Sequence, residues 1–271
     1  MPELPEVETT VRGLRKVLEG ERITAVEPRR ADLRRAIPAD IGQRLTGARV
    51  VGLGRRAKYG LIDTDRGDTL VFHLGMSGHW RIDPAELGPH DHFLIDTKAH
   101  RLALNDARRF GSLDLVRTEQ LAEWPAFKAL GPEPLGGAMS GRWFRSAFKG
   151  RTAAIKLLLL DQRVVAGLGN IYVCEALFRA RISPLRRAGG VSLDRLERLA
   201  HAVPNVLDEA IAAGGSSLRD FASPDGELGY FSKQFDVYGR EGQPCRGGCS
   251  GKVKRILQGG RSTFYCPACQ R

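Results

Sequence analysis

The first residues of the chain combine a proline and a carboxylate in a way that could support nucleophilic chemistry. The sequence begins MPELPEVETT, so Pro2, Glu3 and Glu6 precede the first hydrophobic run. If Met1 is removed, Pro2 supplies a secondary amine at the mature N-terminus, with the Glu3 carboxylate beside it. Proline and acidic residues are also favoured at helix starts, near the positive end of the helix dipole. These residues alone leave both interpretations open.

Four cysteines near the other end of the chain have the spacing of a metal site. Cys245, Cys249, Cys266 and Cys269 are separated by three, sixteen and two residues, which makes two close pairs joined by a hairpin-sized excursion. This pattern is typical of tetrahedral zinc, and four thiolates close the coordination shell, which predicts one structural Zn²⁺. Two disulfides are the alternative, which the absence of a secretion signal disfavours. Cys174 is expected to be a buried small residue.

The segment between the cysteine pairs predicts a hairpin with a cation at its tip. Residues 252–257 and 262–265 suit two strands, Gly259 and Gly260 a turn, and Arg261 then lies at the tip. A guanidinium on such a tip can pair with a phosphate in a bidentate way. A basic zinc ribbon alone indicates only a module that binds nucleic acid or protein.

Composition and charge favour a polyanionic partner. The 271-residue chain is 42% hydrophobic, enough for a core, and carries a formal charge of +11. Residues 231–271 hold eight basic and two acidic side chains, hence +6. No run of eighteen apolar residues occurs and the first residues are acidic, so neither a membrane span nor a secretory signal is expected. We therefore expect a cytoplasmic protein.

Three segments with different periodicities must position these groups. Apolar residues recur at helical spacing over residues 5–19, and short β-rich runs over 22–116 predict an antiparallel sandwich or barrel. After LGPEPLGGAMSG the spacing is helical to about residue 213, with a kink or break expected at Pro204. Residues 214–234 read as a long polar loop. The fold class predicted is multidomain α+β.

Motifs along the whole chain resemble one family. PELPEVE, RRAKY, HLGMSG, RRFG, GLGNIYVCEALFRA and GGRSTFYCPACQ occur in the same order in bacterial formamidopyrimidine-DNA glycosylase, which excises oxidised purines. The resemblance implies a helix plus β-sandwich catalytic domain over 1–134, a helix-two-turn-helix domain with a lesion-covering loop over 135–230, and a zinc finger over 231–271. The partner it implies is double-stranded DNA containing oxidised purines or abasic sites, bound by a monomer without any membrane association.

The resemblance also implies catalytic residues. Pro2 is then the Schiff-base nucleophile, Glu3 the acid that protonates the opening sugar ring, Lys58 a lysine that assists proton transfer and contacts phosphate, and Arg261 the finger arginine that grips phosphates. Successive β- and δ-elimination would then cut the strand. This mechanism requires that the active protein lack Met1, because an amide nitrogen on Pro2 is not nucleophilic.

Six further residues match family positions that contact DNA. Met76, Arg108 and Phe110 resemble the wedge that fills the gap left by the displaced nucleotide, whereas His90, Arg151 and Asn170 resemble residues that bind the DNA backbone. Without the resemblance, Met and Phe at these points are more often core residues. Asn170 follows GLG and precedes an apolar run, so it could instead cap a helix.

Two competing functions remain. Endonuclease VIII shares the zinc finger and the proline nucleophile but prefers oxidised pyrimidines; Leu4 and the 214–230 loop favour the purine enzyme. A non-catalytic zinc-ribbon DNA-binding protein is the second alternative. Pro2, Glu3 and Lys58 argue against it, because a binding protein needs no processed amine.

Overall fold

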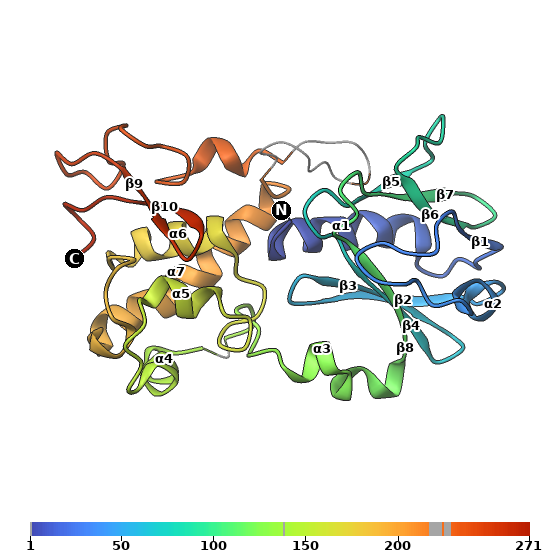
Figure 1. Cartoon of the computed structure of the whole chain (residues 1–271), viewed down its shortest axis with the longest axis horizontal. Coiled ribbons are helices and arrows are strands. Elements are labelled where there is room, and N and C mark those ends of the chain that lie inside the picture. Colours follow the sequence, from blue (N-terminus) through green and yellow to red (C-terminus); the bar gives the residue numbers. More distant parts are fainter. Residues whose placement is uncertain (1, 138, 217–223, 225–228) are drawn as a thin grey trace. The chain divides into compact units, whose positions relative to one another are not determined.

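The computed structural model describes residues 2–137, 139–216, 224 and 229–271, which form two compact units (Figure 1). The first unit combines Met1–Lys128 with Ile211–Ser232, and the second combines Ala129–Ala210 with Lys233–Arg271. The cysteine-bearing tail thus groups with the helical segment. The three-domain division with boundaries at 134/135 and 230/231 stays a prediction.

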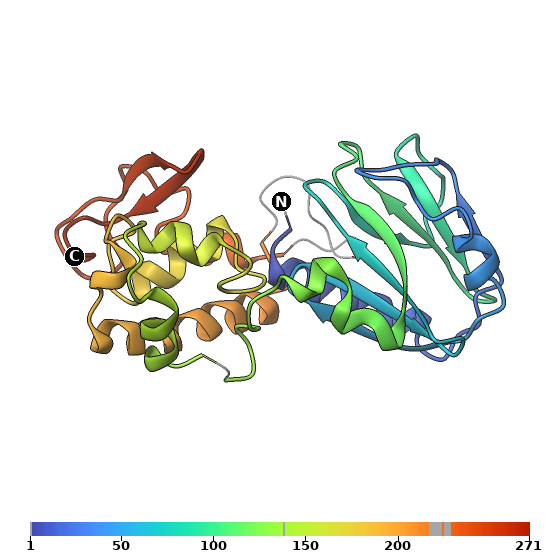
Figure 2. The same cartoon turned by 60° about the horizontal axis from the view of Figure 1, so that its bottom comes forward.

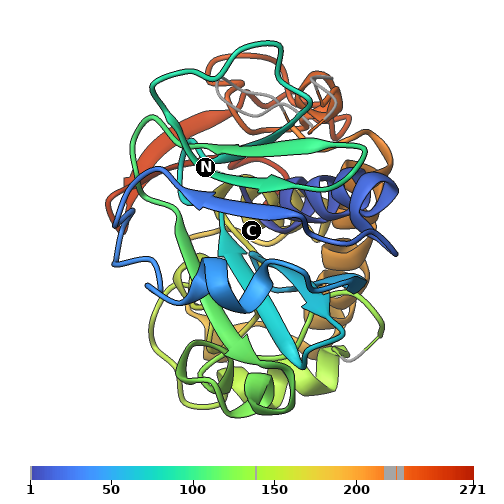
Figure 3. The same cartoon turned by 90° about the vertical axis from the view of Figure 1, so that its right-hand side faces the viewer.

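The strands of the first unit form two four-stranded antiparallel sheets, which Figure 3 shows as two groups of strands. One sheet has the order β1-β6-β7-β5, and the other β2-β3-β4-β8. The strands are β1 (Ala25–Pro28), β2 (Val50–Arg56), β3 (Tyr59–Thr64), β4 (Asp68–His73), β5 (His79–Ile82), β6 (Asp91–Asp96), β7 (Arg101–Asn105) and β8 (Ser112–Arg117). Of the sandwich or barrel expected from the β-rich runs, the structure therefore has the sandwich. Neither β1 nor β5 was predicted.

Helix α1 (Leu4–Leu18) closes the core of this unit. Its apolar residues recur every three or four positions and are buried, among them Val7, Val11 and Leu14, which are at most 1% exposed. The helix packs on β2 and β3 of one sheet and on β5 of the other. The N-terminal residues are therefore fixed to the sandwich. Shorter helices complete the unit: α2 (Ile41–Leu45), η1 (Thr118–Glu123) and α3 (Pro125–Lys128).

The second unit is helical and carries a hairpin. Its helices are α4 (Gly141–Phe148), α5 (Ile155–Leu160), α6 (Asn170–Arg179), η2 (Ala188–Gly190) and α7 (Leu193–Ala212). The last two residues of α7 are grouped with the first unit, and the short helix η3 (Phe231–Gln234) lies where the chain returns from the first unit to the second. Of the kink or break expected at Pro204, the break does not occur, since α7 continues through this residue as one helix. Val203, Val206 and Leu207 are fully buried, and this packing offsets the lost backbone bond. Among the described residues, no helix is long and apolar enough to span a bilayer.

The hairpin of the tail packs against α6, as Figure 2 shows. Strands β9 (Lys254–Gln258) and β10 (Arg261–Tyr265) are joined by Gly259 and Gly260, whose φ angles are +56° and +72°. Positive φ at both turn residues is the geometry of the tightest hairpin turn and favours glycine. The predicted hairpin and turn are confirmed. A small core joins it to α6 through Cys174, 1% exposed as expected, and Phe178.

Candidate functional site

Pro2 and Glu3 lie at the start of α1 and are both buried. Glu3 is the N-cap residue, and its backbone N–H donates to Glu6 Oε2 at 2.8 Å, as in a capping box. The helix-start interpretation of these residues is thus correct as local structure. It does not compete with chemistry, because the cap fixes the backbone on which the Pro2 nitrogen and the Glu3 carboxylate are carried.

Glu6 is a buried residue to which the sequence analysis gave no role of its own. It is 2% exposed, and its other oxygen, Oε1, accepts from both the N–H and the hydroxyl of Ser216, at 2.8 and 2.9 Å. One carboxylate therefore ties the first residues to position 216, where the 214–230 segment begins. Most of that segment lies outside the described residues.

Lys58 lies at the tip of the β2–β3 hairpin. Arg56 pairs with Tyr59, which leaves Ala57 and Lys58 as a two-residue turn, and Ala57 has a φ of +53°. A positive φ is costly for alanine, so its surroundings must hold it. Arg55 does this by donating to the Ala57 carbonyl at 2.8 Å and, on its other side, to Glu8 of α1 at 3.1 Å. The hairpin that carries Lys58 is therefore braced against the helix that carries Pro2.

His73, the last residue of β4, lies near Lys58 and two arginines. Burial, and then Lys58, Arg34 and Arg35, lower the pKa of His73 to about 4, so its ring is neutral at pH 7. Nδ1 accepts from the Gly75 N–H at 3.0 Å, which places the ring proton on Nε2. His73 therefore fixes the loop that leads to Met76. The sequence held a signal for it, the histidine of the HLGMSG motif.

Met76, Arg108 and Phe110 lie on two loops that touch. A Cβ on Gly75 would be 2.3 Å from the Phe110 carbonyl carbon, so the backbones are in direct contact. The Arg108 guanidinium carbon lies 5.0 Å from the centre of the Phe110 ring, which is 45% exposed. For Phe110 the core interpretation is therefore wrong. His90 is exposed on the loop before β6 (Asp91–Asp96).

The second unit holds the remaining predicted residues. Arg151 is exposed between α4 and α5, and Arg261 is exposed as the first residue of β10. Asn170 is the first residue of α6, but the N-cap is Gly169 and no side chain caps the helix, so the capping interpretation is wrong. Its Nδ2 instead donates to the Ser262 carbonyl at 2.9 Å, next to Arg261. Its Oδ1 is buried and has no partner among the described residues.

Two buried charges on α5 and α6 hold the tail, and the sequence analysis missed both. Lys156 is 0% exposed and donates from Nζ to Thr263 Oγ1 at 2.5 Å, on the strand of Arg261. Glu175, also 0% exposed, accepts the backbone N–H groups of Asp236, Val237 and Tyr238 at 2.8 to 3.0 Å. Burial raises the pKa of Glu175, while these donors oppose the rise. The hairpin is thus anchored by hydrogen bonds to helices.

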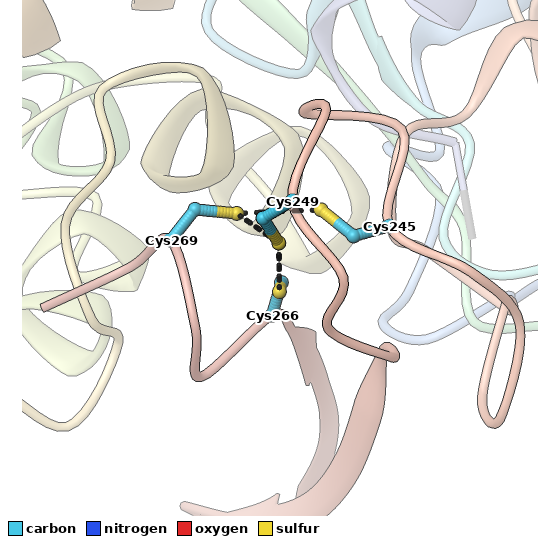
Figure 4. A group of neighbouring side chains, drawn as sticks. All are labelled: Cys245, Cys249, Cys266 and Cys269. Carbon is cyan, nitrogen blue, oxygen red and sulfur yellow. Dashed lines mark hydrogen bonds between the residues drawn. The ribbon is translucent and has the colours of Figure 1, made fainter.

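The four predicted cysteines converge on one point (Figure 4). All their sulfur atoms lie within 4.8 Å of one another. The Cys245–Cys269 pair is 3.3 Å apart, and Cys249 lies 3.5 Å from both Cys266 and Cys269. The two sulfur atoms of a disulfide are about 2.05 Å apart. The alternative of two disulfides therefore does not fit this arrangement. Sulfur atoms about 3.8 Å apart would fit a tetrahedron with metal–sulfur bonds of about 2.3 Å. This group can bind a metal ion.

Backbone donors favour thiolates at this group. The Gly247 N–H donates to Cys245 Sγ at 3.2 Å and the Gly251 N–H to Cys249 Sγ at 3.4 Å. The Gly251 N–H, followed by Cys269, lowers the pKa of Cys249 to about 7. A side chain on Gly251 would come within 2.9 Å of Cys266 Sγ, so the loop must pass close to the sulfur atoms. Such donors are common around metal-bound thiolates because they stabilise the negative charge.

Family models cover most of the chain. The formamidopyrimidine-DNA glycosylase N-terminal domain matches residues 1–113, and the H2TH domain of the same family matches residues 130–222. A formamidopyrimidine-DNA glycosylase of Novosphingobium aromaticivorans is 66% identical over 272 residues, and one of Rhizorhabdus wittichii is 64% identical, each covering 100% of both chains.

Solved structures agree with these relatives. The Lactococcus lactis Fpg G226P mutant in complex with a Fapy-dG containing DNA has a TM-score of 0.91 at 34% identity and covers 100% of both chains. MutM (Fpg) of Thermus thermophilus has a TM-score of 0.88 at 42% identity, covering 99% of this chain and 98% of that one. The chain therefore belongs to the formamidopyrimidine-DNA glycosylase family of base excision repair enzymes.

Proposed function

We propose that this enzyme excises oxidised purines, 8-oxoguanine and formamidopyrimidines, from double-stranded DNA and then cleaves the strand at the abasic site. Membership of the family supports the proposal, as do related structures, since the Lactococcus lactis proteins were crystallised with Fapy-dG containing DNA and with an abasic site containing DNA. The observation that carries it is the start of α1, where Pro2 and Glu3 are buried together on a capped helix end.

Pro2 suits the first step because of its amine. An α-amino group has a pKa of about 7.7–8.0 against about 10.4 for lysine, so a far larger fraction is unprotonated at pH 7. The nitrogen lone pair attacks C1′ of the deoxyribose, and the bond to the base breaks with its electrons passing to the base, which takes up the proton that the proline nitrogen loses. Glu3 then protonates O4′ as the C1′–O4′ bond breaks and the sugar ring opens. The product is an iminium ion, which keeps its positive charge because the proline nitrogen is secondary.

The iminium ion then acts as an electron sink for strand cleavage. Loss of a C2′ proton expels the 3′ phosphate, and a second elimination expels the 5′ phosphate. Lys58 would hold a phosphate and assist proton transfer, and Arg261 would grip phosphates during the final elimination. His90, Arg151 and Asn170 would bind the DNA backbone, so affinity should fall steeply with salt. The enzyme is proposed to act as a monomer in the bacterial cytoplasm, where its DNA substrate lies.

The metal at the cysteine group is proposed to be one structural Zn²⁺. Cys245, Cys249, Cys266 and Cys269 would hold it with a closed shell of four thiolates, so it would cross-link the tail and take no part in the reaction. Measurement of bound zinc per chain by atomic emission tests this assignment. One equivalent is expected, and another metal or none would contradict it.

Borohydride trapping on defined duplexes tests the reaction. A covalent adduct on an 8-oxoguanine duplex is expected, at a higher rate than on a thymine glycol duplex. Preference for thymine glycol would favour an endonuclease VIII-like enzyme, and binding without any adduct would favour a non-catalytic zinc-ribbon protein.

The state of the N-terminus needs its own measurement. Met1 lies outside the described residues, and the mechanism requires that it be removed. Intact mass spectrometry of fully active protein should therefore show loss of Met1, and full retention would contradict the role of Pro2.

A further inference from the structure

Asp106, which directly follows β7, is a buried acid to which the mechanism assigns nothing. Its side chain is 0% exposed, and one of its oxygens binds the loop of residues 74–78 while the other binds the far end of its own loop, residues 106–111. Oδ1 accepts from the Ser77 hydroxyl at 2.6 Å, and Oδ2 accepts from the Gly111 N–H at 2.8 Å. Ser77 follows Met76 and Gly111 follows Phe110, so one carboxylate joins the residues next to both.

The network extends to Arg108 and His90. The Arg108 N–H donates to the same Ser77 hydroxyl oxygen at 3.1 Å, so Ser77 links Asp106 to the backbone of Arg108. The Asp106 N–H donates to the His90 carbonyl at 2.9 Å. Asp106 is therefore bonded directly to His90, through Ser77 to Arg108, and to the residues that follow Met76 and Phe110 in the chain.

The two loops also leave no room for independent movement. Besides the contact of Gly75 with the Phe110 backbone, a Cβ on Gly111 would be 2.9 Å from the His73 carbonyl oxygen and 3.0 Å from Asp106 Oδ2. Backbones packed this closely transmit any displacement of one loop to the other. Loss of the carboxylate would remove the hydrogen bonds that hold this contact in place.

We propose that Asp106 is a positioning residue that makes residues 74–78 and 106–111 one rigid insert, so that Met76, Arg108 and Phe110 enter the DNA together. This inference rests on the proposed function, in which these three side chains fill the gap left by a flipped nucleotide. Filling the gap must offset the cost of unstacking and unpairing. An insert ordered before binding offsets more of it, because no loop-ordering entropy is lost in the complex.

Asp106→Ala tests the proposal, because alanine removes both links. Excision of 8-oxoguanine from a duplex should fall about tenfold or more, as expected when groups that act in the transition state are misplaced by about 1 Å. Cleavage of an abasic site in single-stranded DNA requires no gap filling and should stay near the unaltered rate. Fluorescence of 2-aminopurine beside the lesion should show slower unstacking.

Asp106→Asn is the conservative variant, and it should largely keep the activity on duplex DNA that Asp106→Ala loses. Its Oδ1 can accept from Gly111 and its Nδ2 can donate to the Ser77 hydroxyl oxygen, so both loops stay linked. Ser77→Ala removes the bond from Asp106 to the loop of residues 74–78 but keeps its bond to Gly111. This variant should give an intermediate loss of duplex activity. It also keeps the test available if Asp106→Ala does not fold.

Asp68→Ala is the matched control for stability. Asp68 is a 2% exposed acid and the first residue of β4, whereas His73 is the last. The Asp68 carboxylate pairs with Arg44 and Arg117. The Asp68→Ala variant should lower the melting temperature without a selective loss of activity on duplex DNA. Equal losses of Asp106→Ala on duplex and single-stranded substrates, or no loss on duplex, would overturn the inference. If the unaltered protein cleaves neither substrate, the proposed function itself has failed.

Discussion

The start of α1 and the hairpin β9–β10 both present reactive or cationic groups at an end of a structural element, but they are held in different ways. The first is fixed by an extensive aliphatic core and by the Glu6 carboxylate. Among the described residues, the core of the second has seven fully or nearly buried members, of which three are cysteines. The hairpin region also depends on a hydrogen bond that Lys156 donates and on hydrogen bonds that Glu175 accepts. The first region therefore rests mainly on apolar packing, whereas the second, with its smaller core, should depend more on a cross-link between its sulfur atoms.

Pro2→Gly should separate chemistry from structure in the first region. Excision and borohydride trapping should fall by about 10³-fold or more, as when a covalent nucleophile is lost. Binding to a duplex with an uncleavable abasic analogue should stay nearly unchanged, since the capping box remains. Trapping kinetics and a gel-shift titration check both; undiminished trapping would remove Pro2 from the mechanism.

Cys249→Ser should show the opposite behaviour in the second region. Loss of one of the four sulfur ligands should release the metal and loosen the hairpin with Arg261, which weakens duplex binding by about a hundredfold or more, equal to roughly 3 kcal/mol. Thermal unfolding of the first unit should change little. Cys174→Ser is the matched control, because Cys174 lies outside the four-sulfur group, and equal loss of metal from both variants would contradict the site.

Acid should destabilise the first unit through His73. Its folded pKa of about 4 lies below the unfolded value of 6.5, so the unfolded state binds more protons between these pH values. Stability is then complete above about pH 6.5 and decreases as the pH falls toward 4, by on the order of 2 to 3 kcal/mol. Urea unfolding at pH 7 and 4.5 should show a smaller loss for His73→Asn, whose amide oxygen can accept from Gly75. An equal loss would mean that His73 is not the titrating group.

Loss of an exposed ion pair should have the smallest effect on the free energy of unfolding. Arg198 and Asp194 are four residues apart on α7, with side chains 44% and 79% exposed. Asp194→Ala should change the free energy of unfolding by about 0.5 kcal/mol or less, because solvent screens such pairs. Urea denaturation checks this value. A change above about 1 kcal/mol would indicate coupling to the rest of the unit.

Several elements could be predicted because their signal is local. The helix of residues 5–19 follows from spacing of apolar residues, and the hairpin turn follows from two adjacent glycines. Strands β1 and β5 were missed because each has four residues and few apolar ones, and long-range pairing with β6 and β7 decides them. Pro204 misled the prediction for α7, because tertiary packing outweighed its local cost.

By itself the sequence determined the antiparallel β character of the first unit, the four-cysteine group and the residues whose motifs resemble the family, since each depends on residue types at short spacing. Only the tertiary structure decided which buried polar groups support them: Glu6 on Ser216, Lys156 on Thr263 and Asp106 on Ser77 and Gly111. The reason is physical. A buried polar side chain is defined by the partner that compensates its desolvation, and that partner lies on a segment brought to it by folding.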